Sequence, residues 1–160
     1  MLMTKSEFRK LGANVIDSIY HELRLNNSEL LTFEEDADYD SGRIGNFYIS
    51  ASQFTLCVQV FIRYDVPNYI CTTAIIQLPE DFLQLYPELN EANDELCGVK
   101  VTYNEEFNGL AFICEIDTRN IENNNYGKFV LNGVSTIFQN MTIVIEKNLL
   151  KGVIAAIREL

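Results

Sequence analysis

Few residues of this chain are of the types that catalyse reactions. His21 is the only histidine, and it falls in a segment predicted to be a helix. A nucleophilic serine or cysteine needs a base beside it, and no second imidazole exists to serve one. The glycine patterns that bind phosphates and the G-x-S-x-G motif of hydrolases are absent from the sequence. We therefore expect no catalytic residue, no cofactor and no enzyme activity.

Three alternating aspartates, Asp36, Asp38 and Asp40, are the best candidates for binding a metal ion. A calcium loop of the EF-hand type has this alternation, with glycine at its sixth position and glutamate at its twelfth. Here Ser41 and Phe47 occupy those positions. The same alternation suits an edge strand that enters a turn, where exposed charge discourages aggregation. We favour the strand and turn and expect no metal site, while cation binding by the three aspartates stays open.

The four cysteines, Cys57, Cys71, Cys97 and Cys114, are widely separated and form no C-x-x-C pair. Zinc sites need closely spaced ligands, which this chain lacks. Three of the cysteines lie in apolar stretches, where cysteine behaves as a small apolar side chain. We expect free thiols and an intracellular protein, with two disulfides in a secreted protein as the alternative.

The composition indicates one globular domain. The 160 residues include 12 basic and 23 acidic side chains, so the net charge is −11. This charge repels nucleic acids and anionic membranes. No apolar stretch approaches the ~20 residues of a membrane-spanning helix, and the first residues lack the features of a signal peptide. We expect a cytoplasmic protein that binds neither nucleic acid nor membranes.

The N-terminal segment is predicted to be an amphipathic helix. Thr4 and Glu7 have the spacing of a capping box. In this motif the threonine hydroxyl accepts a hydrogen bond from an early backbone amide of the helix, and the glutamate carboxylate reaches back to the start of the helix. Apolar residues then recur at steps of three and four as far as Leu23, and Asn26-Asn27 ends the pattern.

Alternating residues after this helix predict strands. The clearest strand runs from Gln53 to Tyr64, with one wholly apolar side and one mixed side. This pattern is typical of an antiparallel sheet that is covered on one face. The segment 69–77 is either a further strand or the approach to a helix. Its periodicity does not distinguish the two.

The second half of the chain predicts a helix, a hairpin and a C-terminal helical region. Residues 79–96 keep helical spacing, although Pro87 should kink or split that helix. A hairpin follows at 99–116, and residues 130–145 again recur at helical steps. Residues 150–160 are either a second helix or a continuation of the one before.

The mixed sides of two predicted strands carry more apolar residues than contact with water requires. Cys57 and Phe61 lie on one of them, and Ala111 and Ile113 on the other. If no helix covers these four residues they form an exposed patch, and such patches usually mark a protein partner. The alternative is that the C-terminal amphipathic stretch covers them. We select these four as candidate partner-binding residues.

The order of elements and three short motifs resemble the YbjN and type III secretion chaperone-like family. The motifs are Asp40-Ser41-Gly42 in the first hairpin, Leu89-Asn90-Glu91-Ala92-Asn93 at the end of the middle helix, and Val99-Lys100-Val101 with Gly109-Leu110-Ala111-Phe112 in the last hairpin. The likeness extends from Lys5 to about Lys147. Apart from it, Asn90 and Asn93 are expected to cap the middle helix.

The resemblance implies a single α+β domain over residues 1–147, an antiparallel sheet packed by helices in the order α-βββ-α-ββ-α. Residues 148–160 would be a C-terminal amphipathic helical extension. It also implies a homodimeric, chaperone-like or regulatory module that binds a client peptide on apolar surface, partly by adding a strand to the sheet. The alternative is an acidic immunity or antitoxin-type inhibitor, whose charge neutralises a basic toxin.

Overall fold

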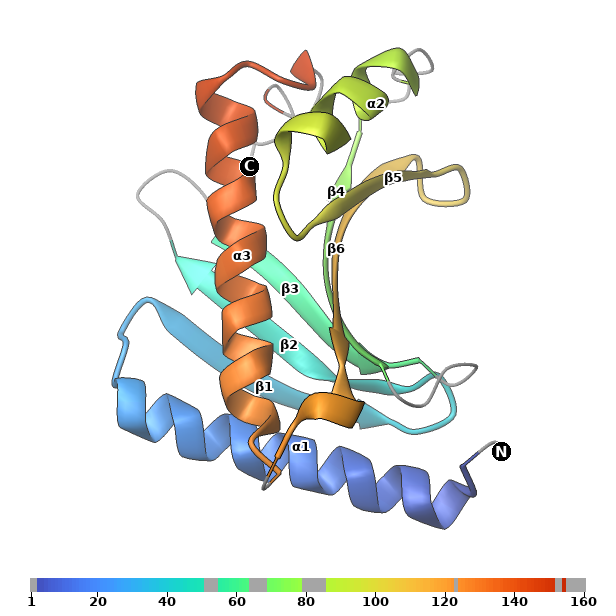
Figure 1. The fold of residues 1–160 in the computed structure, drawn as a ribbon, viewed down its shortest axis with the longest axis vertical. Coiled ribbons are helices and arrows are strands. Elements are labelled where there is room, and N and C mark those ends of the chain that lie inside the picture. The colour runs from blue at the N-terminus through green and yellow to red at the C-terminus, as the bar shows by residue number, and fades with distance from the viewer. Residues whose placement is uncertain are drawn as a thin grey trace.

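The computed structural model describes residues 3–50, 55–63, 69–78, 86–122, 124–151 and 154. In these residues the chain forms three α-helices, a six-stranded antiparallel sheet and one short 3-10 helix (Figure 1). The expected α+β fold, with an antiparallel sheet packed by helices, is confirmed. The segment 69–77, for which a strand and a helix were both open, is a fourth strand before the middle helix.

The elements follow one another as α1 (Lys5–Asn26), β1 (Leu31–Asp38), β2 (Arg43–Ser50), β3 (Thr55–Ile62), β4 (Tyr69–Gln77), α2 (Tyr86–Glu95), β5 (Lys100–Asn104), β6 (Gly109–Asp117), the 3-10 helix (Thr118–Asn120) and α3 (Tyr126–Glu146). The strands lie in the order β1-β2-β3-β4-β6-β5, and every neighbouring pair is antiparallel. β1 and β5 are therefore the two edges of the sheet.

The predicted capping box starts α1. The Thr4 hydroxyl accepts a hydrogen bond from the Glu7 amide at 3.2 Å, and the Glu7 carboxylate accepts one from the Thr4 amide at 2.8 Å. The bond from the Thr4 backbone, helped by the Thr4 hydroxyl, holds the pKa of Glu7 below its usual value. Asn27, with a φ of 44°, ends the helix in the left-handed conformation. Both ends of this helix therefore lie where the sequence predicted them.

The hydrophobic core lies between one face of the sheet and the helices. Leu56, Val58, Val60 and Ile62 are all buried, which confirms the apolar side predicted for the central strand. α3 lies across the sheet (Figure 1) and packs against β4 and β6. Gly133 permits this close approach, because a β-carbon there would lie 2.9 Å from the Thr72 hydroxyl.

α1 crosses the N-terminal end of α3 at Gly127 (Figure 1). The Gly127 amide donates a hydrogen bond to the Ser18 hydroxyl at 2.8 Å. A β-carbon at Gly127 would lie only 2.1 Å from the Ser18 carbonyl oxygen, so no larger residue fits without moving a helix. This contact joins residues 109 positions apart in the sequence and orients α1 relative to α3.

Several expected boundaries lie outside the residues that the structure describes. These are the start of the middle helix at Pro79 and the ends of the central strand at Gln53 and Tyr64. Residues 152–153 and 155–160 lie outside as well, so the helical extension over 148–160 stays a prediction. Within the described residues, no helix has the length and apolar character needed to cross a membrane.

Candidate protein-binding surfaces

The four candidate residues lie on the face of the sheet opposite the helices, which we call the open face. The strand register places Phe61 beside Cys71, Thr73 beside Ile113, and Ile75 beside Ala111. The open face consists of Cys57, Gln59, Phe61, Cys71, Thr73, Ile75, Ala111, Ile113 and Glu115. Three of these side chains, Cys71, Thr73 and Ala111, are buried, and the other six are half-buried or exposed.

Exposure varies across the open face. Ile75 is 44% exposed, Phe61 and Ile113 are half-buried, and Cys71 and Ala111 are buried. α3 packs on the opposite face, where Gly133 meets Thr72. The structure therefore brings the four candidate residues onto one surface, and their role in partner binding stays a prediction.

Described residues line two hollows on the open face. The larger, about 730 Å³, is lined by Gln59, Ile75, Gln77, Leu78 and the β5–β6 turn residues Glu106, Phe107 and Asn108. The smaller, about 480 Å³, is lined by Arg63, Gly98, Val99, Lys100, Ile113 and Glu115. Ile75 and Ile113 thus contribute to different hollows, so the face is grooved on both sides of its centre.

Thr73 occupies the centre of the open face, between Gln59 on β3 and Ile113 on β6. Its side chain is 4% exposed, and its hydroxyl has no hydrogen-bond partner among the residues that the structure describes. A buried hydroxyl without a partner costs about 1–3 kcal/mol.

A polar cluster borders the open face on β1, β2 and β3. Burial raises the pKa of the Cys57 thiol; a hydrogen bond with Tyr48 opposes the rise, and the Glu34 carboxylate adds to it. The pKa of Tyr48 is raised in turn. The charge of Cys57 is the largest cause, and burial and the Glu34 carboxylate add to it. Because the thiolate is the reactive form of cysteine, Cys57 is a poor nucleophile at neutral pH.

The β5 edge of the sheet is closed by an asparagine of α2. The Asn93 amide group donates to the Val101 carbonyl at 3.0 Å and its oxygen accepts from the Val101 amide at 2.8 Å. These are the two bonds that a neighbouring strand would make. The prediction that Asn93 caps the middle helix is therefore wrong, since the residue lies within α2 and bonds the strand.

A second asparagine holds the segment after α2 in the same way. Asn140 of α3 is 3% exposed; its amide group donates to the Cys97 carbonyl at 2.9 Å and its oxygen accepts from the Cys97 amide at 3.0 Å. Together with the ion pair between Lys147 and Glu95, this contact ties α2 to α3.

The β1 edge has no such closure in the described residues. The Ser50 amide donates a hydrogen bond to the Leu30 carbonyl at 3.0 Å. With the register of the two strands, this means that the even-numbered residues of β1 make the backbone hydrogen bonds to β2. Bonding alternates along an antiparallel strand, so Leu31, Phe33 and Glu35 direct their backbone N–H and C=O groups outward. Most of β1 is exposed, and no strand among the described residues lies beyond it.

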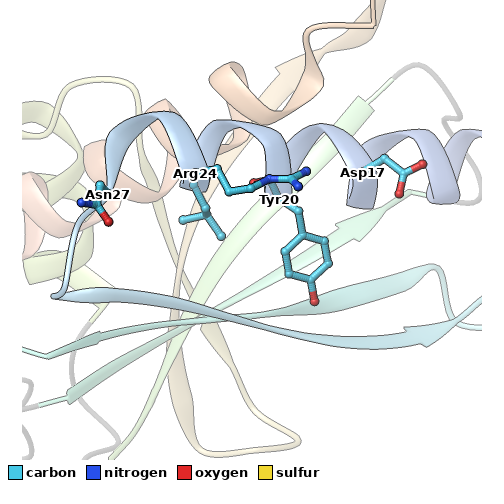
Figure 2. A pocket seen from close by; sticks show the side chains of 5 residues that line it. Asp17, Tyr20, Arg24 and Asn27 are labelled. Atoms are coloured by element: carbon cyan, nitrogen blue, oxygen red, sulfur yellow. The ribbon is translucent and has the colours of Figure 1, made fainter.

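A pocket of about 600 Å³ opens beside this edge, as Figure 2 shows. Side chains of α1 line it, namely Asp17, Tyr20, Leu23 and Arg24, together with Asn27. The Tyr20 ring meets the Phe33 ring of β1 edge-on, with the centroids 5.5 Å apart. The pocket therefore lies next to the outward-facing backbone of β1.

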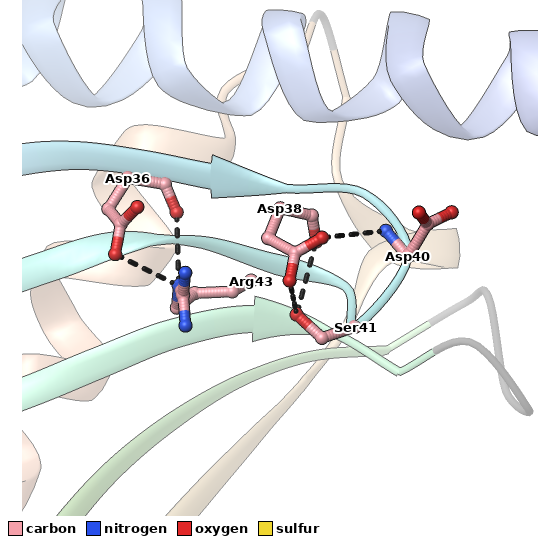
Figure 3. A network of polar contacts seen from close by, with 5 residues as sticks. All are labelled: Asp36, Asp38, Asp40, Ser41 and Arg43. Atoms are coloured by element: carbon pink, nitrogen blue, oxygen red, sulfur yellow. Dashed lines mark hydrogen bonds and ion pairs between the residues drawn. The ribbon is translucent and has the colours of Figure 1, made fainter.

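The three alternating aspartates contact separate partners around the β1–β2 turn (Figure 3). Asp36 forms an ion pair with Arg43 at 3.0 Å, and Asp40 forms one with Lys5 at 3.3 Å. Asp38 accepts hydrogen bonds from the Ser41 hydroxyl at 2.9 Å and the Asp40 amide at 3.1 Å. The Ser41 bond, then the Asp40 bond, hold the pKa of Asp38 below its usual value. The strand and turn expected here are confirmed.

The remaining residues considered for chemistry are dispersed. His21 is exposed on α1, and all four cysteines are free thiols, with Cys71 buried and Cys97 exposed. The sequence analysis did not identify the bonding of Asn93 to the sheet edge or the buried hydroxyl of Thr73. Asparagine is a weak helix former, so its position within α2 was a signal that its side chain has another role. A threonine in a strand gives no such signal.

Comparison with known proteins supports the fold. A chain in the crystal structure of the ExsC–ExsE complex is similar over 82% of this chain and 91% of its own length, with a TM-score of 0.52 and 7% identity. At this identity the likeness concerns the fold alone. It agrees with the secretion chaperone-like architecture and does not point to the YbjN group in particular. No family profile matches the sequence, and neither does any curated protein.

Proposed function

We propose that the chain is a chaperone-like or regulatory protein-binding module, not an enzyme, and that it holds an extended segment of a partner protein. The difference between the two sheet edges carries the proposal. α2 closes the β5 edge through Asn93, whereas β1 has outward-facing backbone groups beside a pocket. That the structurally similar chain comes from a complex supports a binding role.

A partner segment beside β1 would bond the outward backbone groups of Leu31, Phe33 and Glu35. Each backbone hydrogen bond of this kind contributes ~0.5–1.5 kcal/mol net, and alternate side chains of the added strand supply the specificity. A side chain on the helix side of that strand would enter the pocket beside Tyr20 and Leu23. In its more specific form, the proposal is that the chain has a YbjN-like or secretion-chaperone role.

Proline substitution at Glu35 tests strand addition. A partner is purified with the full chain, and its affinity is measured by titration calorimetry with the separated proteins. Glu35→Pro removes an outward N–H group without breaking a bond to β2, since proline is tolerated at such edge positions. We expect binding to weaken by about tenfold or more.

Glu35→Ala is the matched control, because it removes the same side chain and keeps the N–H group. It should bind within a few-fold of the wild type. Equal affinities for the proline and alanine variants would contradict strand addition at β1.

An acidic inhibitor of a basic toxin is the second candidate. The carboxylates of Glu34 and Glu35 on the exposed strand favour it, because they surround the open edge with negative charge. Binding to a cationic protein would then weaken strongly between about 0.05 and 0.5 M salt, as screening shortens the range of the attraction. An affinity that does not change with salt would contradict the inhibitor and leave the chaperone-like module.

A further inference from the structure

The pocket beside β1 carries two charged side chains of opposite sign. Asp17 and Arg24 line it from α1, with Tyr20 between them (Figure 2). We propose that these side chains select the sequence of the added strand: a basic residue beside Asp17, an apolar residue beside Tyr20 and an acidic residue beside Arg24. The inference rests on the proposed strand addition at β1 and adds to it the side chains that the partner must carry.

The three side chains form a row along one face of α1. They are three and four residues apart, a spacing that brings side chains onto the same face of a helix. Asp17 and Arg24 are separated by two helical turns, or ~10 Å along the axis. The Tyr20 ring contacts the Phe33 ring and so holds the middle of the row against β1. The row therefore follows the edge at which a strand would be added.

Neither charge of the row is neutralised within the described residues. Arg24 donates a hydrogen bond from Nε to the Tyr20 carbonyl at 3.3 Å, which leaves its two Nη groups for a carboxylate. It forms no ion pair in the described part of the chain, and the exposed Asp17 forms none there either. A partner can therefore bring a carboxylate to the guanidinium and a cationic group to Asp17.

The spacing of a strand matches this row. Side chains on the same side of a strand repeat every ~6.6 Å, so residues four positions apart span ~13 Å. Long basic and acidic side chains cover the difference from the ~10 Å between Asp17 and Arg24. The residue midway between the two charged ones then lies beside Tyr20, which is 37% exposed. The added strand thus carries its three selected residues at alternate positions.

The direction of β1 sets the order of the two charges. α1 and β1 run in opposite directions, so Arg24 lies nearer the start of β1 and Asp17 lies further along it (Figure 2). An antiparallel pair of strands is slightly more stable than a parallel pair. An antiparallel segment passes Asp17 first, which places its basic residue four positions before its acidic one. The reverse order would bring like charges together at both ends of the row.

Peptide selection on the full chain provides the probe. The library is a phage-displayed set of random peptides of about 12 residues, longer than the exposed strand. We expect peptides with a basic, an apolar and an acidic residue at alternate positions, in that order, whose binding weakens about tenfold or more in Glu35→Pro. Each selected peptide is synthesised together with a version in which the basic and acidic residues are exchanged. Fluorescence anisotropy should show the exchanged version binding the wild type about tenfold more weakly.

Reversal of the two charges on the protein tests which residues select the order. The double variant Asp17→Lys with Arg24→Glu keeps the net charge and should prefer the exchanged peptides. Lys128→Glu with Glu146→Lys is the matched control, because it makes the same exchange of charge at two exposed residues of α3. This control should keep the preference of the wild type. Thermal unfolding verifies that both double variants fold.

The inference and the strand addition fail in different ways. Peptides that lose binding in Glu35→Pro but bind equally well with their charges in either order would refute the inference and leave strand addition standing. A preference that persists in Asp17→Lys with Arg24→Glu would refute it too. If no peptide loses binding in Glu35→Pro, strand addition at β1 is contradicted, and the inference is contradicted with it.

Discussion

Asp117 ends β6 and caps the 3-10 helix that leads to α3. Its carboxylate accepts hydrogen bonds from the Arg119 backbone amide and from the guanidinium Nε, both at 2.9 Å. These bonds, with the guanidinium bond the larger cause, lower the pKa of Asp117 to about 2. The unfolded chain has the ordinary, higher aspartate pKa, so ionised Asp117 favours the folded state.

The pH dependence of unfolding tests this carboxylate. Its stabilising effect is complete above the unfolded pKa and disappears as the pH falls through about 2. Asp117→Asn keeps an acceptor oxygen and removes the charge. We expect a lower midpoint of thermal unfolding at pH 7, and a difference from wild type that shrinks between about pH 4 and pH 2.

Asp17→Asn is the control, since Asp17 is exposed on α1 and forms no ion pair among the described residues. A difference between wild type and Asp117→Asn that stays constant with pH would refute the assigned role.

At the scale of single residues, the sequence predicts the contacts of those residues whose partners are near in the chain. The capping box of Thr4 and Glu7 is one case, because both members lie within one helical turn. Thr73 and Asn93 could not be predicted. What each does depends on residues of other strands or of another element, and no local pattern encodes those contacts. The grouping of Cys57, Phe61, Ala111 and Ile113 on one face followed from strand alternation alone.

At the scale of elements, α2 acts as a substitute for a seventh strand. The side chain of Asn93 makes the two backbone bonds of a strand neighbour, and Asn140 holds the following segment from α3. Periodicity predicted a helix and a hairpin here but not their relation. Strand order and edge closure depend on contacts between distant segments, which hydrophobic spacing does not record.

Opening the β5 edge tests the role of α2. Asn93→Ala should cost about 1–3 kcal/mol of unfolding free energy, because the amide and carbonyl of Val101 lose their partner. It should also make the protein associate at high concentration, since an unprotected edge strand pairs with other edges. Urea denaturation and sedimentation velocity measure the two effects.

Asn90→Ala is the matched control, because Asn90 is exposed on the same helix. It should behave as wild type in both measurements. An Asn93→Ala protein that stays as stable and as monodisperse as Asn90→Ala would show that the edge needs no closure.

At the scale of the whole molecule, we further propose a cytoplasmic homodimer. The four free thiols suit a reducing compartment, and the family resemblance implies the dimer. Each chain carries a net charge of −11. Two copies therefore repel each other at long range, and any interface between them must overcome this repulsion.

Light scattering at several salt concentrations tests the dimer. We expect twice the mass of one chain and a larger fraction of dimer as salt rises, because screening weakens the repulsion between two acidic chains. The mass of a single chain at every salt and protein concentration would contradict it.

The closed β5 edge also limits the composition of any complex that this protein forms through its sheet. In the strand addition that we propose, β1 is the edge that accepts the partner, so each chain would take up one segment there. The proposal therefore predicts a one-to-one stoichiometry at the sheet edge and a finite assembly. A sheet with two open edges would instead join neighbours on both sides and grow into a polymer.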